Sequence, residues 1–140
     1  MGIESFYVNL RIDSADSDKI ENIIKSNELY CSTLNWYFGN EEEKELSLQA
    51  ATVSFYSMCE VIYKLCCDIA GVCKIERIET VNAQHAFDFD CMFDFMRWMY
   101  DCWKFKVDSF NKDWGIFSIK PSDYYKVRQK LRKKYFHTFE

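Results

Sequence analysis

The sequence predicts an α+β fold, namely a ferredoxin-like (split βαβ) sheet of about four strands with two additional C-terminal helices. Apolar and polar side chains alternate from Phe6 to Ile12, which is typical of a strand with one buried face. Four later segments repeat apolar residues at three- and four-residue steps, as amphipathic helices do. The predicted order of strand, helix, strand, strand, helix and strand matches a split βαβ unit.

The first half of the chain is expected to hold one helix and two further strands. Ser14 or Asp16 can cap the helix, whose inward positions are Ile20, Ile23, Ile24 and Asn27. Residues 29–38 are predicted to form the second strand, closed by Gly39 and Asn40. The β-branched and aromatic end of residues 46–55 favours a third strand. Their Glu-rich start and two alanines leave open a helix that continues into the next one.

The second half is expected to be mostly helical. Residues 58–72 carry apolar side chains on one helical face, and Gly71 lies close to the expected end of that helix. Residues 75–89 return to an extended pattern with a bend at Asn82 and Ala83. A long helix over residues 90–114, a short strand over residues 116–119 and a final helix over residues 124–135 complete the prediction.

The long helix has an apolar surface wider than the single stripe of an ordinary surface helix. Its first apolar row contains Met92, Met96, Met99, Trp103, Val107, Phe110 and Trp114. A second row beside it contains Cys91, Phe95, Trp98, Cys102 and Phe105. The clearly polar residues form one strip: Asp94, Arg97, Asp101, Lys104 and Asp108. We expect this helix to be enclosed in the core, to pair with a second copy or to bind another protein.

Composition predicts a single domain over residues 1–140, located in the cytoplasm. A chain of 140 residues with 49% hydrophobic content can bury its own core, and 4 glycines with 1 proline leave no obvious linker. The 7 cysteines show no C-x-x-C spacing, which favours reduced thiols over a disulfide framework. We find no signal-peptide pattern and no apolar run long enough to cross a membrane, so no membrane partner is expected.

Candidate catalytic residues are few, and we predict neither enzymatic activity nor a cofactor. Asp88, Asp90 and Asp94 have the spacing D-x-D-x-x-x-D, which supports the alternative of an enzyme that depends on Mg²⁺ or Mn²⁺. Helix capping explains the same aspartates without a metal. In an extended segment His85 shares a face with Phe87 and points away from Asp88 and Asp90, so we interpret it as a packing residue.

Charge is distributed unevenly along the chain. Residues 120–134 contain 7 basic residues and 1 acidic residue, whereas the whole chain has a formal net charge of −4. This basic segment supports a second alternative, a regulator that binds nucleic acid through its C-terminal helix. The acidic balance of the whole chain, with a sequence pI of about 5.3, argues against nucleic acid as a partner.

The function that these patterns favour is a non-enzymatic protein-binding domain. One form of it is an immunity-type inhibitor that neutralises a basic toxin or nuclease through an acidic and aromatic surface. The residues expected to contact the partner are Glu41, Glu42, Glu43, Glu45, Trp98 and Phe105. The identity of the partner protein is open, and a homodimer is the other association that the wide apolar helix would fit.

Overall fold

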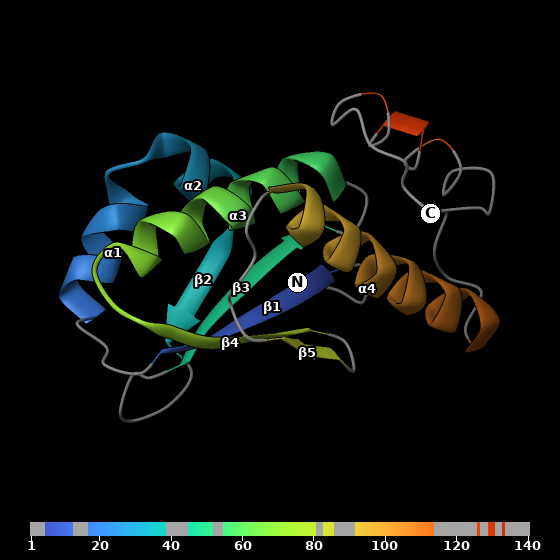
Figure 1. The fold of residues 1–140 in the computed structure, drawn as a ribbon, viewed down its shortest axis with the longest axis horizontal. Coiled ribbons are helices and arrows are strands. Elements are labelled where there is room, and N and C mark those ends of the chain that lie inside the picture. The colour runs from blue at the N-terminus through green and yellow to red at the C-terminus, as the bar shows by residue number, and fades with distance from the viewer. Residues whose placement is uncertain are drawn as a thin grey trace. The chain divides into compact units, whose positions relative to one another are not determined.

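A computed structural model describes residues 5–12, 17–38, 45–51, 55–80, 83–85 and 92–113, together with residues 126, 129, 130 and 133. The chain divides into two compact units, residues 1–88 and residues 89–140, and each is described on its own. The structure has an α+β fold (Figure 1). Among the described residues, no helix combines the length and the apolar character needed to cross a bilayer.

The first unit contains eight of the described elements. In chain order they are β1 (Ser5–Ile12), α1 (Ser17–Lys25), α2 (Glu28–Thr33), β2 (Asn35–Phe38), β3 (Glu45–Ala51), α3 (Phe55–Ala70), β4 (Ile75–Thr80) and β5 (Ala83–His85). The strands form one antiparallel sheet in the order β2-β3-β1-β4-β5. Leu10 of β1 lies opposite Leu46 of β3 and Ile78 of β4. The first strand of the chain is therefore the middle strand of the sheet.

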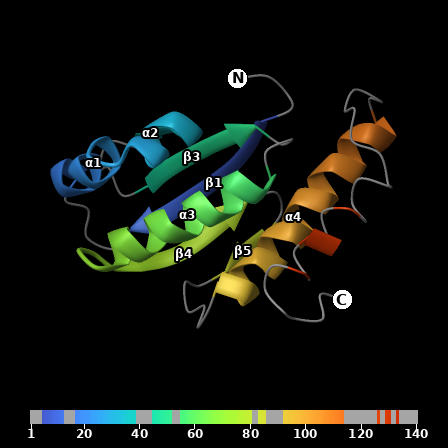
Figure 2. The same cartoon turned by 90° about the horizontal axis from the view of Figure 1, so that it is seen from above.

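The core of this unit lies between the sheet and one layer of helices. Figures 1 and 2 both show α1, α2 and α3 on the same face of the sheet. The strand residues on that face are fully or almost fully buried: Phe6, Val8, Leu10, Ile12, Leu46, Leu48 and Ala50. The helices contribute Ile20, Ile24, Met58, Ile62, Leu65 and Ile69 to the buried set. The alternation in β1 and the apolar faces of α1 and α3 predicted from sequence are thus confirmed.

The prediction of a strand over residues 29–38 is wrong for its first half. Residues 28–33 form α2, and only Asn35–Phe38 are extended. The side-chain oxygen of Asn27 accepts hydrogen bonds from the backbone N–H groups of Leu29 and Tyr30, at 3.0 and 3.4 Å. Asn27 is therefore the N-cap of α2 and not an inward residue of α1, because this capping stabilises a new helix at that point.

The structure also shows the conformation of the stretches that begin at residues 46 and 75, as far as they are described. The stretch that begins at residue 46 is a strand as far as Ala51, and α3 begins at Phe55. The extended stretch from residue 75 is two strands and not one, because β4 and β5 pair antiparallel from Thr80↔Ala83 to Ile78↔His85. The expected bend is therefore a reversal of chain direction.

The second unit contains α4 (Met92–Asp113), which confirms the long helix. Among its described side chains, eight are buried: Phe95, Met96, Met99, Tyr100, Cys102, Trp103, Lys106 and Val107. Six of these belong to the two predicted apolar rows, so a large part of the wide apolar surface is covered. The predicted strand over residues 116–119 lies outside the described residues. Within the predicted final helix, residues 126, 129, 130 and 133 are helical.

Candidate functional site

The exposed side of α4 brings together two of the residues predicted to contact a partner. Besides Met92 and Ser109, the described side chains of α4 that are exposed or half-buried are the following eight, which we call the α4 face: Asp94, Arg97, Trp98, Asp101, Lys104, Phe105, Asp108 and Lys112. Residues seven positions apart return to nearly the same angle on a helix. The α4 face therefore has an aromatic row (Trp98, Phe105), an acidic row (Asp94, Asp101, Asp108) and a basic row (Arg97, Lys104), in that order around the helix. Lys112 lies at the angle of the acidic row, near the C-terminal end of α4.

The aromatic row contains one anchored ring and one exposed ring. The Trp98 ring is tilted against the fully buried Phe95 ring, with centroids 6.2 Å apart, and Trp98 itself is half-buried. Phe105 is 49% exposed. Two turns of helix place Phe105 about 10.5 Å along the axis from Trp98. An exposed phenylalanine beside a fixed tryptophan is a surface that another protein can bury.

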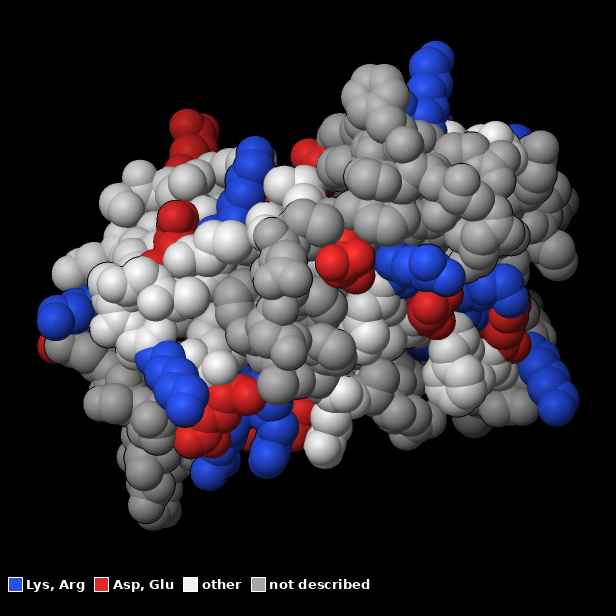
Figure 3. All heavy atoms as spheres, in the orientation of Figure 1, with Lys and Arg blue, Asp and Glu red and all other residues white. Residues whose placement is uncertain are grey.

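The charged rows partly neutralise each other. Lys104 Nζ lies 2.7 Å from Asp108 Oδ2, and both side chains are almost half exposed. In Figure 3 blue and red side chains alternate over the part of the surface that α4 occupies. An exposed pair of this kind adds little to stability. The acidic row lies between this basic row and the aromatic row, so carboxylates border the two rings.

Lys106 lies on the opposite, buried side of α4, and the sequence analysis missed it. Its residue exposure is 6%, and burial lowers the pKa of its ammonium group. The signal was available, because Lys106 falls outside the polar strip and next to the apolar row that holds Trp103 and Val107. The prediction of a single polar strip on this helix is therefore incomplete.

Of the four glutamates predicted to contact a partner, the structure describes Glu45. Glu41, Glu42 and Glu43 lie outside the described residues. Glu45 is the first residue of β3, lies opposite Arg11 of β1, and is half-buried. It belongs to the first unit, whereas Trp98 and Phe105 belong to the second.

The alternative metal site also falls mainly outside the described residues. Asp88 and Asp90 are not described, and Asp94 is an exposed residue in the first turn of α4. Among the described residues, no cluster of three metal-binding side chains occurs. His85 ends β5 opposite Ile78, and its side chain is not described. The prediction of a magnesium or manganese site therefore stays a prediction.

Three of the basic residues in the C-terminal segment, residues 120–134, are described in the structure. Lys126, Lys130 and Lys133 are exposed and helical. The other basic residues of that segment lie outside the described residues. Binding of nucleic acid there stays a prediction as well.

Two of the buried cysteines, Cys66 and Cys102, have raised thiol pKa values. Burial raises the pKa of the Cys66 thiol, and the nearby Cys67 raises it further. Burial, with a contribution from the charge of Asp101, raises the pKa of Cys102 to about 12. Cys31 and Cys67 are exposed thiols. Because thiolates and not thiols attack substrates, Cys66 and Cys102 are unsuited to nucleophilic catalysis.

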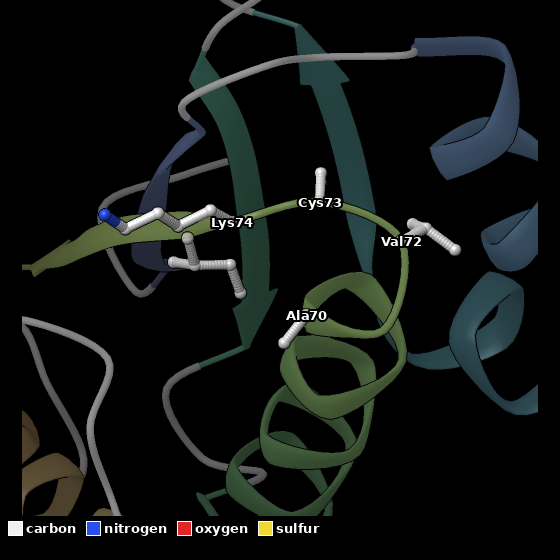
Figure 4. A pocket seen from close by; sticks show the side chains of 5 residues that line it. Ala70, Val72, Cys73 and Lys74 are labelled. Atoms are coloured by element: carbon white, nitrogen blue, oxygen red, sulfur yellow. The ribbon is translucent and has the colours of Figure 1, made fainter.

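A hollow of about 470 Å³ lies where α3 leads into β4. It is lined by Ala70, Val72, Cys73, Lys74 and Ile75. Figure 4 shows the side chains of Val72 and Lys74 pointing in opposite directions. Cys73 Sγ donates a hydrogen bond to the carbonyl oxygen of Ile69 at 3.6 Å. Binding pockets need polar groups that converge on the ligand, and the lining of this hollow does not supply them.

The sheet has a second face, on the side opposite the helices. Polar side chains on that second face form hydrogen bonds between neighbouring strands. Gln49 Nε2 donates to the Tyr7 hydroxyl at 2.8 Å, and Ser47 Oγ donates to Asn9 Oδ1 at 2.7 Å. These bonds join β3 to β1. Ser47 and Gln49 are buried, at 4% and 9% exposure, so these bonds satisfy buried polar groups.

Comparison of the chain with protein-family models, with curated proteins and with solved structures finds no match. Any proposal for the function therefore depends on the surfaces described above.

Proposed function

We propose that this chain is a protein-binding domain that contacts its partner through the α4 face. The observation that carries the proposal is the half-exposed Phe105 beside the anchored Trp98, on a helix whose other side is buried. Burying aromatic side chains supplies much of the affinity of protein interfaces. Anchoring Trp98 against Phe95 also reduces the side-chain entropy that binding would cost.

The charges next to these rings indicate the chemistry of the partner. Asp94, Asp101 and Asp108 border the aromatic row, so a partner with an apolar pocket flanked by lysine or arginine would complement the α4 face. A basic toxin or nuclease has this character, and the domain would then act as an immunity-type inhibitor without catalytic activity. The net charge of −4 would speed the approach of such a partner at low salt.

Two features of the wider chain complete this proposal. We propose that residues 5–80 are a split βαβ, ferredoxin-like unit, since β1 lies between β3 and β4 with both neighbours antiparallel and β2 pairs with β3. We also propose a reducing, cytoplasmic location, which is supported by the exposed thiols Cys31 and Cys67.

The proposed contact is tested with Phe105→Ala. Proteins captured from the source cells by the wild-type domain are identified first, and their affinity for both forms is then measured by calorimetry. Removing a ring at the centre of an interface costs on the order of 2 kcal/mol, so binding should weaken about 30-fold.

Val72→Ala is the matched control, because Val72 is 48% exposed and lies in the first unit. It should leave the affinity unchanged. A captured partner that is basic and loses affinity only with Phe105→Ala supports the proposal. Equal binding by wild type and Phe105→Ala would remove the α4 face from the interaction.

A further inference from the structure

β2 is an edge strand with one unpaired side. In the described part of the sheet it pairs only with β3 and stands at the end of the strand order. Its outer side therefore presents backbone N–H and C=O groups to any extended chain that can align with it. The most direct occupant of such an edge is another β-strand.

The sequence of β2 lacks the features that normally keep edges apart. Asn35, Trp36, Tyr37 and Phe38 include neither a charge nor a proline. Proteins commonly protect an exposed edge with lysine, proline or a bulge. The opposite edge of the sheet is β5, which is only three residues long.

Aromatic side chains occupy both faces of β2. Tyr37 is 53% exposed, the highest value among the large hydrophobic residues described. Trp36 and Phe38 lie on the other face in a T-shaped contact, with ring centroids 6.2 Å apart. Both are half-buried. The strand thus offers unburied aromatic surface above and below its open edge.

We propose that β2 pairs antiparallel with β2 of a second copy of this chain, about a two-fold axis that passes through Tyr37. This register places Trp36 opposite the partner subunit's Phe38, and Tyr37 opposite the partner's Tyr37. Opposite residues of an antiparallel pair share a face, so every aromatic side chain of β2 meets another aromatic side chain. Aromatic cross-strand pairs are favourable, and the absence of charge removes any repulsion between the identical strands.

This self-complementarity is the reason for choosing a second copy over an unrelated strand. The pairing joins two five-stranded sheets into one continuous sheet with two-fold symmetry. A four-residue strand buries less surface than a typical stable interface, so the dimer is weak and its formation depends on concentration. The inference goes beyond the proposed function, because it uses a different element from α4.

The test compares Tyr37→Lys with Val72→Lys by light scattering over a concentration series. The two positions are similarly exposed, at 53% and 48%, so each variant gains one charge and loses one exposed apolar side chain. The wild-type mass should rise toward that of a dimer. Tyr37→Lys places two like charges directly opposite each other and should weaken dimerisation about tenfold. Val72→Lys should behave as wild type.

A second measurement fixes the register. Opposite positions in an antiparallel pair have Cβ atoms about 4.5–5.5 Å apart, close enough for a disulfide after a small adjustment. In a background in which the exposed Cys31 and Cys67 are replaced by serine, Tyr37→Cys should therefore form a covalent dimer under mild oxidation, whereas Val72→Cys and the background protein should not. A wild-type chain that stays monomeric at every concentration, equal weakening by both lysine variants, or no specific disulfide at position 37 would each overturn the proposal.

Discussion

The hydroxyl group of Tyr30 shows what a single residue contributes to this fold. It donates a hydrogen bond of 2.5 Å to Oδ2 of Asp68, and this bond joins α2 to α3. The residue is only 2% exposed. Burial is the largest cause that raises the pKa of Tyr30 above its ordinary value of 10.0, and the hydrogen bond to Asp68 adds to it. The contact is therefore both a packing feature and a titratable one.

Replacing Tyr30 with phenylalanine keeps the ring and removes this bond. The free energy of unfolding should fall by about 1–2 kcal/mol. A hydrogen bond to a charged carboxylate is stronger than a neutral one, but the exposed Asp68 can bond to water in the variant, which limits the loss. Urea unfolding followed by circular dichroism measures the difference. Tyr37→Phe changes an exposed tyrosine in the same way and should leave the stability near that of wild type.

The stabilities of wild type and Tyr30→Phe should respond differently to alkaline pH. The folded chain keeps the Tyr30 proton to a higher pH than the unfolded chain does. Its contribution to stability is therefore complete below pH 10 and is lost as the pH rises above that value. The stability gap between wild type and Tyr30→Phe should narrow above pH 10, and a gap that stays constant to higher pH would contradict the raised pKa.

At the scale of the elements, the joint between α1 and α2 depends on Asn27. Its backbone N–H donates to the carbonyl of Ile24 in α1 at 3.2 Å, and its side chain caps α2. One residue thus ends one helix and begins the next. α2 has only six residues, so its own propensity cannot sustain it, and the cap is a large part of what keeps it helical.

We expect Asn27→Ala to lower the free energy of unfolding by about 1 kcal/mol, the usual cost of a lost N-cap. Chemical denaturation with a far-UV signal measures this change. Asn22→Ala is the control, because Asn22 is an exposed residue inside α1 and alanine is the better helix former there. If both variants lost the same stability, the side chain of Asn27 would not be acting as a cap.

The missed helix shows where sequence patterns are insufficient. Residues 29–38 contain apolar and aromatic side chains whose spacing fits a strand as well as a helix. Asn27 followed by Glu28 was the available signal for a helix start. The bond from Tyr30 to Asp68, 38 positions away, adds to this local cap, and no local pattern contains that information. In β1, by contrast, local alternation alone identified residues that are 0% exposed.

The same reasoning applies to the candidate site. The seven-residue spacing of Trp98 and Phe105 predicts that they share a side of α4, and the structure places them so. Spacing does not say that Phe105 is 49% exposed while Phe95 is fully buried, because exposure depends on what packs against each ring. Lys106 is different, because its place outside the polar strip could be seen from the spacing alone. Periodicity assigns faces to residues, whereas neighbours determine which face is open.

At the scale of the whole molecule, the sheet predicts a hierarchy of local stability. β1 is bonded on both sides, to β3 and β4, whereas β5 has three residues and pairs with β4. Amide protons of β1 should exchange most slowly and those of β5 fastest among the described strands, because exchange of a central strand requires disruption of the sheet. Hydrogen exchange followed by mass spectrometry resolves this order. Equal protection of β1 and β5 would show that the sheet opens as one unit.

The central position of β1 also has a consequence for the order of events during synthesis. β1 leaves the ribosome before β3 and β4, so Leu10 has no cross-strand partner until Leu46 is made and lacks its second one until Ile78 follows. The apolar side chains of β1 therefore stay without their partner strands during most of the translation of the first unit. Slower translation between β1 and β4 would lengthen that wait, so the yield of folded protein should depend on the speed at which this part of the chain is made.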